Sequence, residues 1–181
     1  MNTTRDGRLG DRRLLRVVYS AEAIRRRVEE MGREIGKAYA PGADILVLGL
    51  LKGSFIFIAD LVRHVPIPIQ VDFLAASSYG KGRVSSGDVE LVYNPKASME
   101  NRHVILVEDI VDSGTTINRV MPLLTERRPA SLEICTLLHK RVAELEWAVR
   151  WVGFDAPGDF LVGYGLDFAE DFRHLPYIGS I

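Results

Sequence analysis

The segment Val104-Ile-Leu-Val-Glu-Asp-Ile-Val-Asp-Ser-Gly-Thr-Thr116 decides the fold of this chain. Its first four residues are apolar and mostly β-branched, which predicts a buried strand. The carboxylates Glu108 and Asp109 follow, then Asp112, and the turn Ser113–Thr116 opens a helix. Acids and free backbone N–H groups therefore meet at the carboxyl end of a strand, where open α/β sheets bind ligands. Because amides at a helix start carry partial positive charge, this pattern indicates a sugar-phosphate site.

The composition is that of one ordinary globular domain. The chain has 181 residues, of which 47% are hydrophobic and 26% charged. A formal charge of −1 predicts no general attraction to nucleic acid or to an anionic membrane. No apolar segment approaches the roughly 18–20 residues that a membrane span needs. The single cysteine, Cys135, lies in an apolar run, so we expect a buried structural thiol and a reducing, cytoplasmic location.

Strand and helix signals alternate along the chain. Residues 1–16 begin with a polar, Arg-rich stretch that does not read as a secretory signal, and we expect a flexible tail before a single domain over 17–181. The other expected elements are helices over 20–39, 55–62 and 115–128 and strands over 45–51, 69–75, 90–93, 132–138, 151–154 and 160–163. The glycine- and serine-rich segment 77–88 predicts an exposed, mobile loop within a hairpin. Together these patterns predict an α/β fold with a mostly parallel, doubly wound sheet, and neither GxGxxG nor GxxxxGK[ST] is present.

Several ordered motifs carry a resemblance to a known family. Residues 107–116 resemble the phosphoribosyl pyrophosphate (PRPP) loop of the type I phosphoribosyltransferases. Further matches narrow the resemblance to the purine branch and its hypoxanthine-guanine group: Leu51-Lys52-Gly53 to the pyrophosphate loop, Ser78-Tyr79 to the mobile lid, Leu138–Arg141 to the purine-reading lysine segment, and 152–154, 160–167, 172–173 and 175–179 to the C-terminal hood. The resemblance covers roughly residues 17–181. One departure is Val92-Tyr93-Asn94-Pro95, where the family usually has a strand ending in Lys-Asp, so the hairpin exit and its subunit contacts stay unassigned.

The resemblance implies a fold and an activity. The implied fold is a central, mostly parallel sheet flanked by helices, with a mobile hairpin lid and a small hood contributed mainly by residues 151–181. The implied reaction is the Mg²⁺-dependent transfer of ribose 5-phosphate from PRPP to N9 of hypoxanthine, and of guanine, giving IMP or GMP and pyrophosphate in purine salvage. Catalysis by such an enzyme would be mostly positioning and electrostatic stabilisation. The implied partners are PRPP, a 6-oxopurine and Mg²⁺, in a homo-oligomer (a dimer or tetramer) without nucleic acid or membrane.

The resemblance also assigns roles at the PRPP end of the site. Glu108 and Asp109 would accept hydrogen bonds from the ribose hydroxyls, and Asp112 would act beside N7 of the purine as the general base. The 5′-phosphate would be bound by Ser113, Gly114, Thr115 and Thr116, and the pyrophosphate by Lys52, Gly53 and Arg173. The bond between Leu51 and Lys52 is often cis in the family.

The purine end and the metal complete the assignment. Lys140 would donate to O6, Phe160 would stack on the ring, and Leu161 would offer its backbone carbonyl. Asp167 would lie near the base and bind Mg²⁺ through water, with Glu108 and Asp109 as further candidate metal ligands. Ser78 and Tyr79 would belong to a lid that excludes water.

Each assignment has a simpler alternative. The acids at 108 and 109 can cap the sheet edge or pair with surface arginines, and Asp112 can cap the helix, alone or besides its catalytic role. Lys52 and Lys140 can be solvated surface lysines, and Phe160 can belong to the core. The segment 77–88 can be an inert loop. For the whole chain the alternatives are an RNA-binding regulator on the same fold, which calls for a basic face, and a nucleotide-binding module without turnover.

Overall fold

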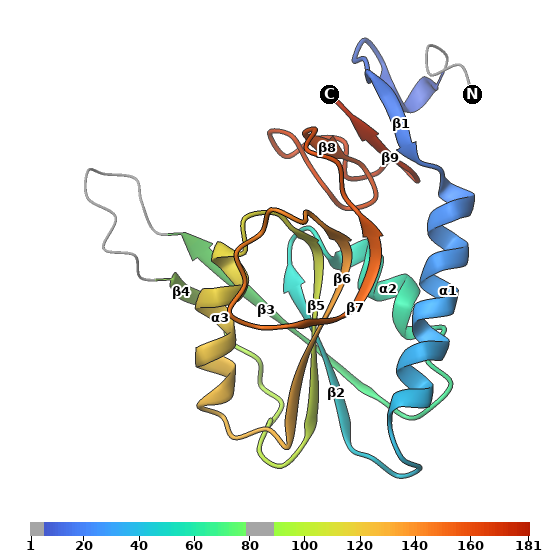
Figure 1. Ribbon diagram of the computed structural model, residues 1–181. Helices are drawn as coiled ribbons and strands as arrows, with labels where there is room; N and C mark the ends of the chain where they lie inside the picture. Colours follow the sequence, from blue (N-terminus) through green and yellow to red (C-terminus); the bar gives the residue numbers. More distant parts are fainter. Residues whose placement is uncertain (1–5, 79–88) are drawn as a thin grey trace, which may run out of the picture.

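A six-stranded sheet forms the centre of the molecule (Figure 1). The computed structural model describes residues 6–78 and 89–181. Five strands run parallel in the order β3, β2, β5, β6, β7, with bounds Gln70–Ser78, Ile45–Leu51, His103–Val111, Ser131–His139 and Val149–Asp155. The sixth strand, β4 (Val89–Tyr93), pairs antiparallel with β3 at one edge. The predicted α/β fold with a mostly parallel sheet is confirmed.

Helices cover both faces of this sheet. The helices α1 (Ala21–Ala38) and α2 (Phe55–Val62) lie over one face and α3 (Thr115–Thr125) over the other (Figure 1). Successive strand side chains point to opposite faces, so Ile105 and Val107 pack with α1 and α2 while Val104 and Leu106 pack with α3. Burial on both faces explains why the strands read as continuous apolar runs rather than as alternating ones.

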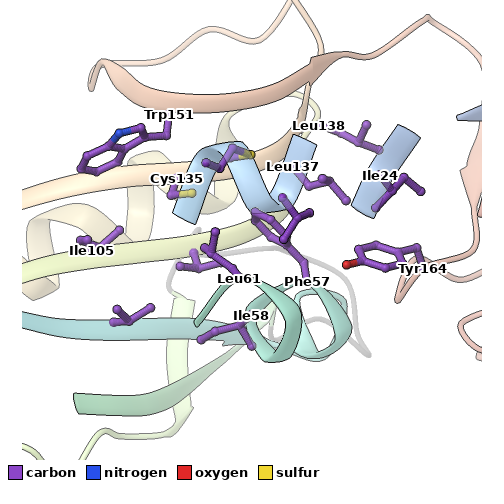
Figure 2. Close-up of a cluster of buried hydrophobic side chains, with 14 of the residues drawn as sticks. Ile24, Phe57, Ile58, Leu61, Ile105, Cys135, Leu137, Leu138, Trp151 and Tyr164 are labelled. Atoms are coloured by element: carbon purple, nitrogen blue, oxygen red, sulfur yellow. The ribbon is translucent and has the colours of Figure 1, made fainter. Parts of the chain in front are cut away.

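The helix α1 forms where its sequence pattern predicts. Ser20 is its N-cap, and the Ser20 hydroxyl accepts a hydrogen bond from the Ala23 amide at 3.2 Å. The buried stripe of the helix consists of Ile24, Val28, Met31, Gly32 and Ile35. Figure 2 shows this core at the contact with α2, where Phe57 and Leu61 face the apolar side chains of β6. Cys135 of β6 is fully buried in the same core, as predicted.

A second, three-stranded antiparallel sheet forms the hood. Its order is β1 (Arg16–Tyr19), β9 (Ile178–Ser180), β8 (Leu161–Val162). Figure 1 shows this sheet above the carboxyl ends of the central strands. Residues 151–181 are predicted to supply most of the hood, and β8 and β9 lie in that range; its first residues instead belong to β7 of the central sheet, and β1 adds a strand from near the N-terminus. Long-range pairing of β1 with β9 leaves no local sequence signal.

The expected flexible tail over residues 1–16 is not what the structure shows for residues 6–16. Leu9 and Leu14 are buried against hood residues that include Phe172 and Leu175. The hood backbone also holds this segment, since the Leu15 amide donates to the Ser180 carbonyl at 2.8 Å. Leu9 lies among glycines and arginines, and Leu14 stands beside Leu15, which is 77% exposed, so the sequence shows no periodic stripe that would predict which leucines are buried.

The hairpin β3–β4 is confirmed, although β3 extends past the predicted end at Ala75. Pairing with β2 stops at Ala75, and β4 pairs with the last residues of β3 beyond it. An antiparallel partner therefore supports a serine-rich stretch whose composition gives no strand signal. Of the two predicted lid residues, Ser78 ends β3, and Tyr79 lies outside the described residues. Among the described residues, no helix has the length and apolarity to cross a membrane.

Candidate active site

The predicted site residues meet at a pocket of about 360 Å³ under the hood. Its walls come from the carboxyl ends of β2, β5 and β6 and from the hood loops, which gathers residues far apart in sequence. Those predicted from sequence that line it are Lys52, Gly53, Glu108, Asp109, Asp112, Thr116, Lys140, Phe160, Leu161, Asp167 and Arg173. A second hollow of about 220 Å³ at the start of α3 is lined by Ser113, Gly114 and Thr115 and shares Glu108, Asp112 and Thr116 with the pocket.

Near the end of β5, Asp109 is buried, and Glu108 is half-buried with its Oε2 atom buried; neither side chain forms an ion pair among the described residues. Burial, followed by the charge of Asp109, raises the pKa of Glu108 well above its ordinary value. Burial raises the pKa of Asp109 to about 6, although backbone N–H groups and the charge of Arg173 act in the opposite direction. The buried Oε2 atom of Glu108 accepts no hydrogen bond from the described residues. Hydroxyl donors or a cation in the pocket would stabilise both carboxylates.

The turn after β2 lies directly against this acid pair. A Cβ atom placed on Gly53 would lie 1.8 Å from Asp109 Oδ2. Gly165 approaches the same turn from the hood with φ of +102°, and a Cβ atom there would lie 2.1 Å from the Gly53 carbonyl oxygen. The bond between Leu51 and Lys52 is cis. Glycine is required at both contacts because any side chain would separate the turn from its neighbours.

The turn before α3 has the geometry of an anion site. Gly114 is the N-cap residue with φ of 88°, and the Ser113 hydroxyl lies 3.0 Å from that of Thr115. The first amides of α3 have no intrahelical partner, and the first residues of the helix, Thr115 and Thr116, line the hollow. Asp112 does not cap this helix, because the N-cap residue is Gly114 and the Asp112 carboxylate pairs with Lys140 rather than with a helix amide.

Lys140 and Asp112 form an ion pair across the pocket. Lys140 Nζ lies 3.1 Å from Asp112 Oδ1, and the lysine side chain is 13% exposed while the aspartate is 63% exposed. The backbone of the lysine is fixed as well, since its amide donates to the Val111 carbonyl at 2.9 Å. Lys140 is therefore not the solvated surface lysine of the simpler alternative.

Phe160 lies at the rim of the pocket and is 54% exposed, which rules out the core alternative. Its ring meets the ring of Phe168 edge-on, with centroids 5.6 Å apart and an interplanar angle of 84°. The adjacent Leu161 is buried in β8. The Phe160 ring is thus held at the pocket by Phe168, a neighbour that the sequence does not predict.

Charged side chains of the hood complete the pocket. Arg173 donates to the Gly165 carbonyl at 2.7 Å and pairs with Asp167 at 2.8 Å. Glu170, which the sequence analysis also missed, pairs with Arg173 at 3.2 Å and with Lys52 at 3.0 Å. Neither Glu170 nor Phe168 has a distinctive sequence signal, because each is exposed in an irregular loop and gains its partners only through the fold.

Asn118 is a further residue that sequence reasoning missed. Its amide nitrogen donates to the Glu144 carbonyl at 2.8 Å, and its side-chain oxygen accepts from the Glu146 amide at 3.0 Å. The loop after β6, which begins with Lys140, is thereby attached to α3. Gly114 lies against the same loop, since a Cβ atom there would lie 2.4 Å from the Glu144 oxygen.

The acids that line the pocket are candidate ligands for Mg²⁺. Among the described residues there is no cluster of three or more metal-ligating side chains. The charge of Asp167 contributes to the raised pKa of Asp109, so these two carboxylates lie near one another at the pocket. Mg²⁺ commonly takes one or two carboxylates plus substrate phosphates and waters, so this donor set fits a substrate-bound ion rather than an all-protein cage.

Comparison with known proteins agrees with the sugar-phosphate site that the geometry indicates. The model of the phosphoribosyl transferase domain matches residues 17–169. A hypoxanthine phosphoribosyltransferase of Buchnera aphidicola is 44% identical over 169 residues, covering 92% of this chain and 96% of the relative, and that of Escherichia coli K12 is 45% identical, covering 87% and 90%.

Solved structures agree. A hypoxanthine phosphoribosyltransferase of Staphylococcus aureus matches with a TM-score of 0.85 and 39% identity, covering 93% of this chain and 91% of that chain. A hypoxanthine-guanine phosphoribosyltransferase of Bacillus anthracis matches with a TM-score of 0.87 and 37% identity, covering 93% and 99%. With the acid pair, the phosphate turn and the hood all in place, the chain belongs to the phosphoribosyltransferase family, within its hypoxanthine-guanine group.

Proposed function

We propose that this protein transfers ribose 5-phosphate from PRPP to N9 of hypoxanthine and guanine, with Mg²⁺, giving IMP or GMP and pyrophosphate. The observation that carries the proposal is the buried Glu108–Asp109 pair beside an anion-binding turn. A pentose carrying a 5′-phosphate supplies what both features need, because its hydroxyls donate to the carboxylates while its phosphate accepts from the amides of α3.

The purine would lie between the Lys140–Asp112 pair and Phe160. O6 and N7 lie side by side on one edge of a 6-oxopurine, and the ion pair offers one donor and one acceptor 3.1 Å apart. Lys140 donates to O6, Asp112 accepts the proton at N7, and Phe160 stacks on the ring. The 6-amino group of adenine is itself a donor, so an ammonium at this position selects against it.

Catalysis in this pocket rests on charge and position. As the bond from ribose C1 to the pyrophosphate lengthens, positive charge develops on the ribose ring and negative charge on the leaving group. Glu108 and Asp109 stabilise the first, while Lys52, the Gly53 turn and Arg173 bind the second. Asp109 and Asp167, with Glu108, would hold Mg²⁺ partly through water, and the ion would supply further charge neutralisation for the pyrophosphate.

The proposed cellular location and oligomeric state are inferred from the cysteine content and from the family resemblance. The lone cysteine is buried, which suits a reducing cytoplasm. The family resemblance favours a homo-oligomer.

A panel of reactions tests the proposal. The purified protein is incubated with PRPP, Mg²⁺ and each of hypoxanthine, guanine, xanthine and adenine, and nucleotide and pyrophosphate are measured. We expect IMP and GMP, no AMP, and loss of turnover with EDTA that excess Mg²⁺ restores. Absence of pyrophosphate release with every base would refute the proposal.

A further inference from the structure

Glu170 lies beside the pocket, in contact with two residues that line it. Its carboxylate bridges the two basic side chains assigned to the pyrophosphate end, with Oε1 3.0 Å from Lys52 Nζ and Oε2 3.2 Å from the Arg173 guanidinium. Two oxygens on one group therefore contact two cations from different loops, as two oxygens of a phosphate would. The pairing with Lys52, followed by that with Arg173, lowers the pKa of Glu170, so it is ionised at neutral pH.

The backbone of Glu170 is held while its side chain stays free to move. The Glu170 backbone amide donates to Asp167 Oδ2 at 2.9 Å, and this hydrogen bond holds the backbone of Glu170 in place. The Glu170 side chain is 66% exposed, and the Lys52 side chain is 69% exposed. Exposed ion pairs are worth little, and a long side chain can rotate into solvent without disturbing the fold.

Arg173 does not depend on Glu170 for its orientation. Its guanidinium also donates to the Gly165 carbonyl at 2.7 Å and contacts Asp167 at 2.8 Å. Removing the Glu170 charge therefore leaves Arg173 in place and frees Lys52, rather than collapsing the pocket. Glu170 is therefore not needed to position Arg173 in the site.

We propose that Glu170 is an affinity-determining residue that competes with the pyrophosphate group for Lys52 and Arg173. The inference rests on the proposed function, since it assumes that these two side chains bind the pyrophosphate of PRPP. On binding, the ligand displaces the Glu170 carboxylate into solvent, and on release the carboxylate returns. Glu170 thereby weakens binding of PRPP and of the product pyrophosphate, which helps the product to leave.

The test is direct binding of pyrophosphate with Mg²⁺ to the full-length protein, by calorimetry, for the parent and for Glu170→Gln. Glutamine keeps the size of the side chain and removes its charge. We expect a Kd for pyrophosphate lowered about three- to tenfold in the variant, because two exposed ion pairs no longer compete. The KM for PRPP should fall in parallel, while the KM for hypoxanthine stays unchanged.

A matched control is Glu126→Gln. Glu126 is exposed at the end of α3, away from the residues that line the pocket, and its change alters the net charge equally. This variant should bind pyrophosphate as the parent does. If Glu126→Gln gained as much affinity for pyrophosphate as Glu170→Gln, the change in net charge alone would explain both, and the inference would be refuted.

Two further outcomes overturn the inference. An unchanged or weaker affinity in Glu170→Gln would show that Glu170 does not compete, or that it positions Lys52 for the ligand. A crystal structure with pyrophosphate and Mg²⁺ should show the carboxylate away from both cations, and retained pairs beside the bound ligand would refute displacement. A parent protein that neither binds pyrophosphate nor releases it from PRPP would instead refute the proposed function.

Discussion

The backbone of Gly53 lies against the carboxylate of Asp109, so closely that a Cβ atom on the glycine would lie 1.8 Å from Asp109 Oδ2. The turn that the family assigns to pyrophosphate is thus in contact with an acid assigned to ribose. This contact joins β2 to β5 at their carboxyl ends. A substitution that moves the Gly53 turn therefore also moves the Asp109 carboxylate.

Gly53→Ala is expected to lower kcat/KM by about a hundredfold or more, because the methyl group forces the turn and the carboxylate apart. The melting temperature should fall with it. The matched control is Gly158→Ala, where a Cβ atom meets nothing within 4 Å. Steady-state kinetics and thermal denaturation of both variants check the prediction, and equal behaviour of the two would contradict the role of the contact.

Asp112→Asn is expected to lower kcat by about 10²–10⁴-fold, because the amide cannot accept the N7 proton as a carboxylate does. PRPP binding, measured by calorimetry, should stay close to that of the parent, since the Asp112 carboxylate pairs with Lys140. Unchanged turnover would remove Asp112 from the chemistry.

Lys140→Ala is expected to raise the KM for hypoxanthine and guanine about tenfold or more, because the hydrogen bond to O6 comes from a charged donor. The neighbouring Arg141→Ala is the control, since Arg141 is 68% exposed and pairs with Asp155 outside the pocket. A KM for both bases that does not change in Lys140→Ala would show that this lysine does not contact the purine.

The buried acid pair predicts a pH dependence of stability in the ligand-free protein. The folded-state pKa of Asp109 is raised from 3.8 to about 6, so between these values the folded protein holds a proton that the unfolded chain has released. Stability therefore falls as pH rises through this window. Asp109→Asn removes this loss, and its melting temperature at pH 7.5 should exceed that of the parent by about 3 °C.

The measurement for this prediction is thermal denaturation of metal-free protein at several values between pH 4 and 8. The gap between Asp109→Asn and the parent should be largest above pH 6 and should narrow toward pH 4. Glu126→Gln, at an exposed position, should follow the parent throughout. A gap that is the same at every pH would show that the effect of the substitution is steric.

Asn118→Ala is expected to destabilise the protein by about 1–2 kcal/mol and to lower kcat/KM about tenfold, because two hydrogen bonds attach the Lys140 loop to α3. Arg119→Ala, at the next and exposed position of α3, is the control for loss of a side chain. Urea denaturation and kinetics test both, and an active, fully stable Asn118→Ala would show that the loop keeps its place without this bridge.

The sequence by itself determined the central layers and the residue types of the site. Apolar runs such as 104–107 can only be buried, and the change of period at α1 marks a helix, because these signals depend on neighbouring residues alone. Glu108, Asp109 and the turn before α3 follow one another in the chain, so their common place at the end of β5 could be predicted. The family resemblance then supplied the more distant partners, such as Lys140 and Arg173.

Only the tertiary structure decided how these groups meet. The place of β1 in the hood and the burial of Leu9 and Leu14 depend on partners more than a hundred residues away, which no local pattern encodes. The bridge from Glu170 to Lys52 joins residues 118 positions apart. Such contacts arise from chain packing, so an exposed glutamate whose sequence context predicts only a solvent-facing charge contacts residues of the pocket once the hood is folded over the sheet.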